Sequence, residues 1–509
     1  MSDLFANPLE EMIEFQDLKT DLQRGQGPLL VTGCLDSQKV HLLSELSDLT
    51  PWKLIVTYDD SRAREICEDY RCFDTDISLY PARDLLFYTS DIHGNLLTKQ
   101  RIQVMRRVLE SSGGVVVTTI DGLMEHLLPL AWMKERSLTI GAEDVVEVGK
   151  LVHALAEMGY EKVAQVEGSG QFSVRGGIVD IYCLTEENPW RIELWGDEID
   201  SIRSFDPESQ RSLENLEELT IYPAVEHIGD KDMVSFLDYF PEERTIIFLD
   251  EPNRLTEKGG AVEEEYRQSR MHREEKGSRN LPENWLCSFE QLQKELNKRN
   301  CISVCALEPK QAGWKVREKF YLEVKSISAY NNSFELLVKD LHQYKKQGYK
   351  IALLSGSRTR AERLAKDLQE EGLAAFYGQD YDREILPGEI MVVYGHAKKG
   401  FEYPLIKFAV MTESDIFGQE QKKKKIRSRD ITHRMIGSRI QDFAELSIGD
   451  FVVHEKHGLG IYRGIEKVEV DRIVKDYIKI EYRGGSNLYI PATQLDCLQK
   501  YSGADASKA

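Results

Sequence analysis

Short apolar runs near the start of the sequence place the strongest constraint on the fold. Three of them, at residues 28–33 (PLLVTG), 52–57 (WKLIVT) and 114–119 (GVVVTT), are separated by segments with helical periodicity. Continuous apolar runs that alternate with helices are typical of parallel strands, because helices then cover both faces of the sheet. We therefore predict an α/β domain over residues 1–133.

The pattern changes to alternation of apolar and polar residues in the next part of the chain. Residues 171–184 (QFSVRGGIVDIYCL) and 190–206 (WRIELWGDEIDSIRSFD) show this period of two, with Gly turns between them. Such a pattern predicts a mainly antiparallel α+β module, which we place at residues 134–222. A buried strand at 244–252 (RTIIFLDEP) then resumes the first pattern, so the module is predicted to be inserted into an α/β domain that continues over 223–320.

The rest of the chain divides into four parts. Strand and helix signals alternate again over residues 321–420 and predict a second, separate α/β domain. Residues 421–445 are predicted to form a basic linker or helix, and its run of Lys and Arg at 422–429 is either solvated or contacts phosphate. Several short strand signals at 446–503 predict a small SH3-like or Tudor-like β-barrel, and 504–509 has the composition of a linker.

The composition excludes some functions. The 509 residues include 66 Lys and Arg against 86 Asp and Glu, which gives a formal net charge of −20. Because binding to a nucleic-acid backbone depends mainly on Lys and Arg, we do not expect a protein whose main task is to clamp nucleic acid. The sequence has no apolar stretch of the roughly 18 residues that a membrane span needs, and its start is acidic. We predict a cytoplasmic protein without a membrane partner.

An altered phosphate-binding loop follows the first apolar run. A working loop has the pattern G-x-x-x-x-G-K-[ST], in which glycines let backbone N–H groups face the phosphates and the hydroxyl binds magnesium. The corresponding residues here are GCLDSQKV, in which Gly33 and Lys39 fit the pattern. Gln38 replaces the second glycine, Val40 replaces the hydroxyl residue, and Asp36 adds negative charge. The loop is therefore predicted not to bind ATP.

An acidic pair follows a later strand. In the segment FLDEP, Asp250 and Glu251 follow the apolar residues of the strand. Helicase-type ATPases have acidic residues at such a strand end, where they position magnesium and water. Such a pair is common after strands and is weak evidence alone. Together with the altered loop, it indicates the remains of a nucleotide site.

These motifs together resemble the N-terminal half of the bacterial transcription-repair coupling factor (Mfd) family. The resemblance rests on LLVTGCLDSQKV, FSVRGGIVDIY, WRIELWGDEIDSIRSFDP, FLDEP, VMTESDIFG, GDFVVHEKHGLGIYRG and LYIPATQL. It implies a UvrB-like, degenerate helicase fold divided into parts 1a (1–133) and 1b (223–320), a UvrA-binding module (134–222) and an RNA polymerase-interacting domain (446–503). It also implies that residues 504–509 begin a linker to an absent translocase.

The resemblance implies a non-catalytic adaptor. The chain would recruit UvrA for nucleotide excision repair and dock on the β subunit of RNA polymerase, as a monomer and without a cofactor of its own. ATP, magnesium and DNA would be used by the absent translocase, which removes stalled polymerase. The alternative is an active UvrB-like NTPase that recognises damaged DNA. However, the stretch YPARDLLFYTSDIHGN is too short for the damage-probing hairpin of UvrB.

One face of the inserted module carries candidate UvrA contacts. In the segment RIELW, alternation places Ile192 and Leu194 on the core side, and Arg191, Glu193 and Trp195 on the other. The same reasoning places Phe172 and Val174 opposite Ser173 and Arg175. The face is either a solvated charge ladder or an interface, since Trp and Arg often dominate binding energy. The resemblance implies that Arg175, Arg191, Glu193 and Trp195 contact UvrA, so Arg191→Ala should cost at least about 1 kcal/mol of binding.

A strand of the predicted barrel carries candidate polymerase contacts. An exposed strand can bind a partner by adding a strand to the sheet. We predict that Arg463, Ile465, Lys467 and Val468 form such an edge, and the resemblance implies contact with the β subunit. Alternatively, Ile465 and Val468 face the barrel core.

No metal site is predicted. The eight cysteines form no C-x-x-C pair, and His454 and His457 lie beside a Gly turn without a third ligand nearby.

Overall fold

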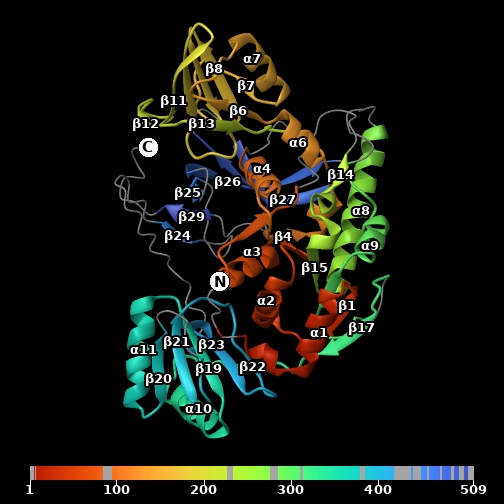
Figure 1. Cartoon of the computed structure of the whole chain (residues 1–509), viewed down its shortest axis with the longest axis vertical. Helices are drawn as coiled ribbons and strands as arrows, with labels where there is room; N and C mark the ends of the chain where they lie inside the picture. The colour runs from red at the N-terminus through yellow and green to blue at the C-terminus, as the bar shows by residue number, and fades with distance from the viewer. Residues whose placement is uncertain are drawn as a thin grey trace. The chain divides into compact units, whose positions relative to one another are not determined.

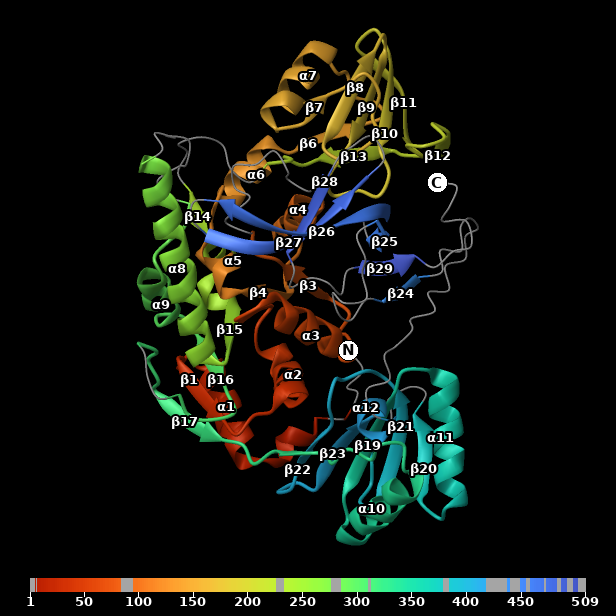
Figure 2. The same cartoon turned by 180° about the vertical axis from the view of Figure 1, so that it is seen from behind.

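The computed structural model (Figures 1 and 2) describes most of the chain. The described residues are 5, 7–83, 95–225, 233–275, 285–309, 313–378, 384–417, 437–439, 449–454, 458–470, 473–482, 487–491 and 498–501. Contacts divide the chain into two compact units, the larger of which comprises residues 1–83, 93–263 and 282–420. Within the described residues, no helix has both the length and the apolar character needed to cross a membrane.

A parallel sheet forms the first α/β part of the larger unit. Its described strands are β1 (Leu29–Thr32), β2 (Trp52–Thr57), β3 (Ile77–Tyr80), β4 (Gly114–Thr119), β15 (Thr245–Asp250), β16 (Cys301–Val304) and β17 (Glu318–Tyr321). They lie in the order β17-β1-β16-β15-β2-β4-β3, and all their pairs are parallel. The three apolar runs coincide with β1, β2 and β4, which confirms the predicted parallel sheet.

Helices connect and accompany these strands. They are α1 (Ile13–Gln23), α2 (Asp36–Glu45), α3 (Asp60–Tyr70), α4 (Asn95–Glu110), α5 (Ile120–Met124), α6 (Leu130–Arg136), α8 (Pro252–Glu275) and α9 (Phe289–Leu296). Asp59 caps the start of α3, where its side chain accepts a hydrogen bond from the backbone N–H of Arg62 at 2.7 Å. Short strands β5 (His126–Leu127) and β14 (Val234–Ser235) pair antiparallel.

The inserted module consists of a six-stranded, mainly antiparallel sheet, a separate two-stranded sheet and one helix. Its strands are β6 (Leu138–Gly141), β7 (Glu161–Lys162), β8 (Gln171–Arg175), β9 (Ile178–Tyr182), β10 (Trp190–Trp195), β11 (Glu198–Phe205), β12 (Ser212–Asn215) and β13 (Glu218–Ile221). The order is β12-β11-β10-β9-β8-β7, and β13 pairs with β6. Helix α7 (Val148–Glu157) lies against this sheet (Figure 1), and its Leu151 and Leu155 share a core with Phe172 and Ile192.

A second α/β sheet lies in the same unit. Its strands are β18 (Lys325–Ser326), β19 (Lys350–Ser355), β20 (Ala374–Gly378), β21 (Glu389–Tyr394), β22 (Phe401–Tyr403) and β23 (Phe408–Thr412), in the order β18-β22-β23-β19-β21-β20. Its helices are α10 (Phe334–Gln347), α11 (Arg358–Glu370) and α12 (Glu413–Phe417), of which α10 and α11 lie beside the sheet in Figure 2. Phe401, Tyr403 and Phe408 belong to the same apolar cluster as Val40 of α2, so the two α/β parts share a buried core.

The smaller unit contains an antiparallel sheet. Its strands are β24 (Gly437–Arg439), β25 (Phe451–His454), β26 (Gly458–Val470), β27 (Ile473–Glu481), β28 (Asn487–Pro491) and β29 (Leu498–Tyr501), in the order β24-β29-β25-β26-β27-β28. Within the described strands, no pairing of β24 with β28 closes the sheet, so the expected barrel is not confirmed. Strand β24 falls within the expected linker or helix, whereas the basic run at 422–429 and residues 504–509 lie outside the described residues.

Candidate functional site

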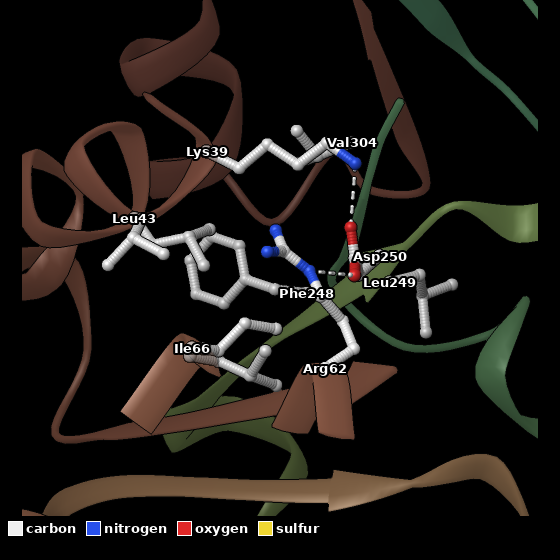
Figure 3. Close-up of a pocket in the computed structure, with 10 residues that line it drawn as sticks. Lys39, Leu43, Arg62, Ile66, Phe248, Leu249, Asp250 and Val304 are labelled. Carbon is white, nitrogen blue, oxygen red and sulfur yellow. Dashed lines mark hydrogen bonds and ion pairs between the residues drawn. The ribbon is translucent and has the colours of Figure 1, made fainter. Parts of the chain in front are cut away.

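The structure brings together Lys39, Asp250 and Glu251, three residues of the predicted degenerate nucleotide site, at one edge of the first sheet. Lys39 lies on α2, directly after β1, and Asp250 and Glu251 lie at the end of β15. The Lys39 ammonium contacts Asp250 Oδ1 at 2.7 Å (Figure 3). It also contacts Glu251 Oε1 at 2.6 Å. The amine that would bind phosphate and the carboxylates that would hold magnesium are therefore bonded to one another.

A second cation completes this cluster and was missed in the sequence analysis. Arg62 points toward Asp250 from α3 (Figure 3), and its Nε lies 3.2 Å from Asp250 Oδ2. Thr57 also donates to Asp250 Oδ2, at 2.9 Å. No local pattern distinguishes Arg62 from the other charged residues of its helix, because its partner lies 188 positions away. We call Lys39, Arg62, Asp250 and Glu251 the closed cluster.

The charges of the closed cluster stabilise one another. Burial disfavours the ionised form of Asp250, but Lys39 and Arg62 outweigh burial and hold the pKa of this carboxyl below its ordinary value. Burial likewise disfavours charged Lys39, yet Asp250 and Glu251 together raise the pKa of the ammonium. Lys39, Arg62 and Asp250 are all more than nine-tenths buried. The cluster is thus a charged, internally paired network.

The loop before α2 makes several close contacts within the chain. Gly33 has a φ of 84°, and a Cβ at this position would lie 2.2 Å from the Leu322 carbonyl oxygen, so the protein's own backbone occupies that space. The Gln38 side chain is buried, accepts from the Leu35 N–H at 3.1 Å and donates to the Tyr403 hydroxyl at 3.1 Å. A loop with the pattern G-x-x-x-x-G-K-[ST] has a glycine at the position of Gln38, so it has no side chain there to make these contacts.

The second α/β part lies against the same loop. The backbone N–H of Lys399 donates to Ser37 Oγ at 3.1 Å, and that of Lys398 donates to Asp69 Oδ1 at 2.9 Å. His41 Nδ1 lies 2.9 Å from the Tyr403 hydroxyl. We call these contacts of residues 398–403 with α2 and α3 the seam. Residues Asp36 to Lys39, where a phosphate would lie in a working loop, therefore contact other parts of this chain.

Strand β10 shows the predicted alternation. Ile192 and Leu194 are buried in the core of the module, whereas Trp195 is 85% exposed. Arg191 and Glu193 lie on the same face as Trp195, and so does Arg175 of the nearby strand β8. The structure thus places the four predicted UvrA-contacting residues on one face.

Two ion-pair groups organise this face. Asp180 of β9 is buried and accepts hydrogen bonds from both Arg175 and Arg191, while Glu193 pairs with Arg203. Sequence reasoning missed Asp180, although an Asp between Val179 and Ile181 in an apolar strand was a usable signal. Ser173, predicted to lie on the open face, is also buried. The face is therefore not a simple solvated charge ladder.

The predicted polymerase-facing edge lies on β26. Residues 458–461 of this strand pair with β25, and residues 461–470 pair with β27. In the part of the chain that the structure describes, the β25 side of β26 has no partner strand beyond Tyr462, so this side is an available edge. Ile465 is 41% exposed there, beside buried Ile478, and Arg463 pairs with Glu481 at 2.6 Å.

The structure describes only some of the other residues for which predictions were made on this sheet. The backbone of Lys467 and Val468 belongs to β26, but their side chains lie outside the described residues, as does His457. His454 is buried. Among the described residues, no group of three or more His, Cys, Asp or Glu side chains could hold a metal ion.

Two parts of the chain match known domain families. Residues 138–227 match the UvrB interaction domain, and this range contains Arg175, Arg191, Glu193 and Trp195. Residues 446–502 match the CarD-like/TRCF RID domain, which contains the edge of β26.

Whole-chain comparisons agree with these matches. The transcription-repair-coupling factor of Bacillus subtilis (strain 168) is 28% identical to this chain, over 98% of this chain and 47% of that protein. The transcription-repair-coupling factor of Staphylococcus epidermidis is 26% identical, over 99% of this chain and 48% of that protein. The chain therefore spans about half the length of these relatives. A solved structure of a hypothetical ATP-dependent RNA helicase from Sulfolobus tokodaii matches over 77% of this chain and 82% of the helicase chain. The sequence identity is 10% and the TM-score is 0.23, which is too low to establish a shared fold. The resemblance found in the sequence is confirmed: over nearly its whole length, the chain is related to the N-terminal half of transcription-repair-coupling factors.

Proposed function

We propose that this chain is a non-catalytic adaptor that recruits UvrA through the inserted module and docks on the β subunit of RNA polymerase through the sheet of β24 to β29. The observation that carries this proposal is the presence of two separate domain matches, each with an exposed apolar side chain on its candidate surface. These side chains are Trp195 and Ile465.

The UvrA side of the proposal rests on the composition of one face. Trp195 supplies a large exposed apolar surface, and Arg175 supplies a charged group that is 45% exposed. Aromatic and Arg side chains of this kind contribute most to interface energies. The match of residues 138–227 to the UvrB interaction domain supports a partner within the repair machinery.

The polymerase side rests on backbone geometry. The edge of β26 beyond Tyr462 offers N–H and C=O groups that a strand of the β subunit could pair with, and Ile465 adds an apolar contact. Arg463 is 40% exposed despite its pair with Glu481, so it can also meet an acidic group of the partner.

The closed cluster supports a chain without ATPase activity. Its Lys and carboxylates contact one another, and the seam covers part of the loop that would bind phosphate. In a longer protein of this family, ATP, magnesium, DNA translocation and the removal of stalled polymerase would belong to residues outside this sequence. We expect the adaptor to act as a cytoplasmic monomer, where UvrA and RNA polymerase are found.

Crossed binding measurements test the proposal. Purified UvrA and the polymerase β subunit are each titrated against the wild-type chain and its Trp195→Ala and Ile465→Glu variants. Trp195→Ala should weaken only UvrA binding, and Ile465→Glu should weaken only polymerase binding. Leu336→Ala is the matched control, because Leu336 is an exposed apolar residue on α10, outside both candidate surfaces. Two variants that weaken both partners equally, or neither, would contradict the adaptor.

A further inference from the structure

A buried carboxylate organises the candidate UvrA-binding face. Asp180 on β9 is 1% exposed and accepts three hydrogen bonds. Arg191 donates from Nε to Oδ1 at 2.6 Å and from Nη2 to Oδ2 at 2.9 Å, and Arg175 donates from Nη2 to Oδ2 at 2.6 Å. Charge-assisted and bidentate bonds of this type fix the orientation of a guanidinium group strongly.

Arg191 is largely committed to the interior of the module. Besides its two bonds to Asp180, it donates to Gln210 Oε1 at 3.0 Å, and its guanidinium lies 4.3 Å from the centre of the Phe205 ring. Its side chain is only 13% exposed. Most of its bonding capacity is therefore used within the module, and it presents little surface to a partner.

Arg175 differs from Arg191 in exposure. Asp180 anchors it at one nitrogen, yet the side chain remains 45% exposed. Because one carboxylate serves two arginines, this group keeps one net positive charge. Arg175 is therefore a pre-oriented cation at the surface, and pre-orientation lowers the entropy lost on binding.

An apolar end continues the same face. Trp195 pairs across the sheet with Glu198, which in turn bridges to Val145. Trp195 and Val145 are 85% and 71% exposed, so two apolar side chains flank one carboxylate. The face thus has a cationic part at Arg175 and an apolar part at Trp195 and Val145.

We propose that Asp180 is a positioning residue for UvrA binding: it holds Arg175 toward a carboxylate of UvrA, while Trp195 enters an adjacent apolar site on that protein. Arg191 supports this arrangement from within and does not itself make the main contact. This inference rests on the proposed function, because it specifies how the same face meets the same partner.

The test compares UvrA affinity for matched variants of the whole chain. Asp180→Asn and Arg175→Ala should each weaken binding about tenfold, because both remove the oriented cation. The double variant should be little weaker than either single variant, since the two changes act on one contact. Both single variants should also reduce the dependence of affinity on salt. Glu157→Gln is the control, because Glu157 pairs with Arg136 away from this face, and it should bind normally.

A loss of folding is separated from a loss of positioning. Circular dichroism and thermal unfolding are recorded for each variant. If Asp180→Asn does not fold, the double variant Asp180→Leu with Arg191→Met replaces the buried pair by apolar groups, which proteins often tolerate. This double variant still removes the anchor of Arg175 and should bind UvrA about tenfold more weakly.

Several outcomes would overturn the inference. Arg175→Ala with wild-type affinity, or equal and additive losses from Asp180→Asn and Arg175→Ala, would show that Asp180 does not act through Arg175. Wild-type affinity in the Asp180→Leu, Arg191→Met chain would do the same. If Trp195→Ala weakens UvrA binding in any of these cases, the proposed function survives and only the positioning role fails. If the wild-type chain does not bind UvrA, the proposed function itself fails.

Discussion

Two clusters in this molecule use the same chemistry in different surroundings. In the closed cluster, buried Asp250 contacts Lys39 and Arg62, and in the inserted module, buried Asp180 contacts Arg191 and Arg175. Each has one buried aspartate between two cations. They differ in exposure, because both cations of the closed cluster are buried, whereas Arg175 reaches the surface on the same face as Trp195.

This difference shows what makes a charged cluster functional. When every charge is paired inside the protein, the cluster contributes to the stability of the fold. Removing one partner then leaves a buried charge unpaired. When one member remains exposed, the same network can orient that member toward a partner. The motif at Lys39 resembles a catalytic loop, yet of the two clusters only that of the inserted module leaves a cation exposed for the proposed partner.

The largest expected effect is on the closed cluster. Asp250→Asn should lower the free energy of unfolding by about 3 kcal/mol at neutral pH, because Lys39 and Arg62 lose their shared buried partner. Because the pKa of Asp250 is lowered in the folded chain, this contribution is present above the ordinary Asp pKa of about 3.9 and is lost as the pH falls through the folded value.

Urea unfolding at pH 7 measures this effect. The matched change Asp180→Asn should cost less, about 2 kcal/mol, because Arg191 loses its buried partner but Arg175 can turn toward water. An equal loss for both variants would contradict the distinction between the closed and open clusters.

The next effect concerns the open face. Trp195→Ala should weaken UvrA binding by about 2 kcal/mol, or roughly thirtyfold, because an exposed Trp loses its whole contact area. Its unfolding curve should match that of the wild-type chain, since the side chain is 85% exposed. A titration by calorimetry together with urea unfolding checks both parts. A large loss of stability without a loss of affinity would show that Trp195 supports the fold and does not contact UvrA.

A smaller effect is expected at the seam. Burial raises the pKa of Asp69 to about 6. Between the ordinary Asp pKa and this value, the folded chain holds more protons than the unfolded chain, so lowering the pH from 7 to 5 should add stability. This gain should be about 1 kcal/mol and should be absent in Asp69→Asn. Unfolding curves of the two chains at pH 7 and pH 5 provide the comparison, and parallel changes in both would refute the role of Asp69.

The smallest effect is expected for an exposed ion pair of the seam. Lys399 Nζ lies 3.5 Å from Asp36, and both side chains are more than half exposed. Lys399→Ala should change the free energy of unfolding by no more than about 0.5 kcal/mol, because solvent screens the pair and its backbone N–H still reaches Ser37. A loss comparable to that of Asp250→Asn in urea unfolding would show that this pair, and not the buried cluster, holds the region together.

Much of the fold followed from local sequence patterns. The apolar runs at β1, β2 and β4 predicted the parallel sheet, and alternation along β10 predicted which side chains face the core. The prediction from Gln38 and Val40 that the loop does not bind ATP stays a prediction, which the turnover measurement below tests. These signals depend on neighbouring residues in the sequence, so one strand or helix is enough to reveal them.

Contacts between distant residues were not predictable in the same way. Arg62 meets Asp250 only because the fold brings the start of α3 to the end of β15, and Tyr403 reaches His41 across 362 positions. The seam and the shared core of the two α/β parts have the same origin. The expected barrel was inferred from the number of short strands, which does not determine whether the edges of a sheet meet.

ATP turnover tests most directly the claim that this chain is a non-catalytic adaptor. The purified chain and its Lys39→Ala variant are incubated with ATP and magnesium, and released phosphate is measured in preparations that also bind UvrA. If the closed cluster has no catalytic role, both proteins should release no more phosphate than a protein-free control. Turnover by the wild-type chain that Lys39→Ala abolishes would contradict this account and establish an active nucleotide site.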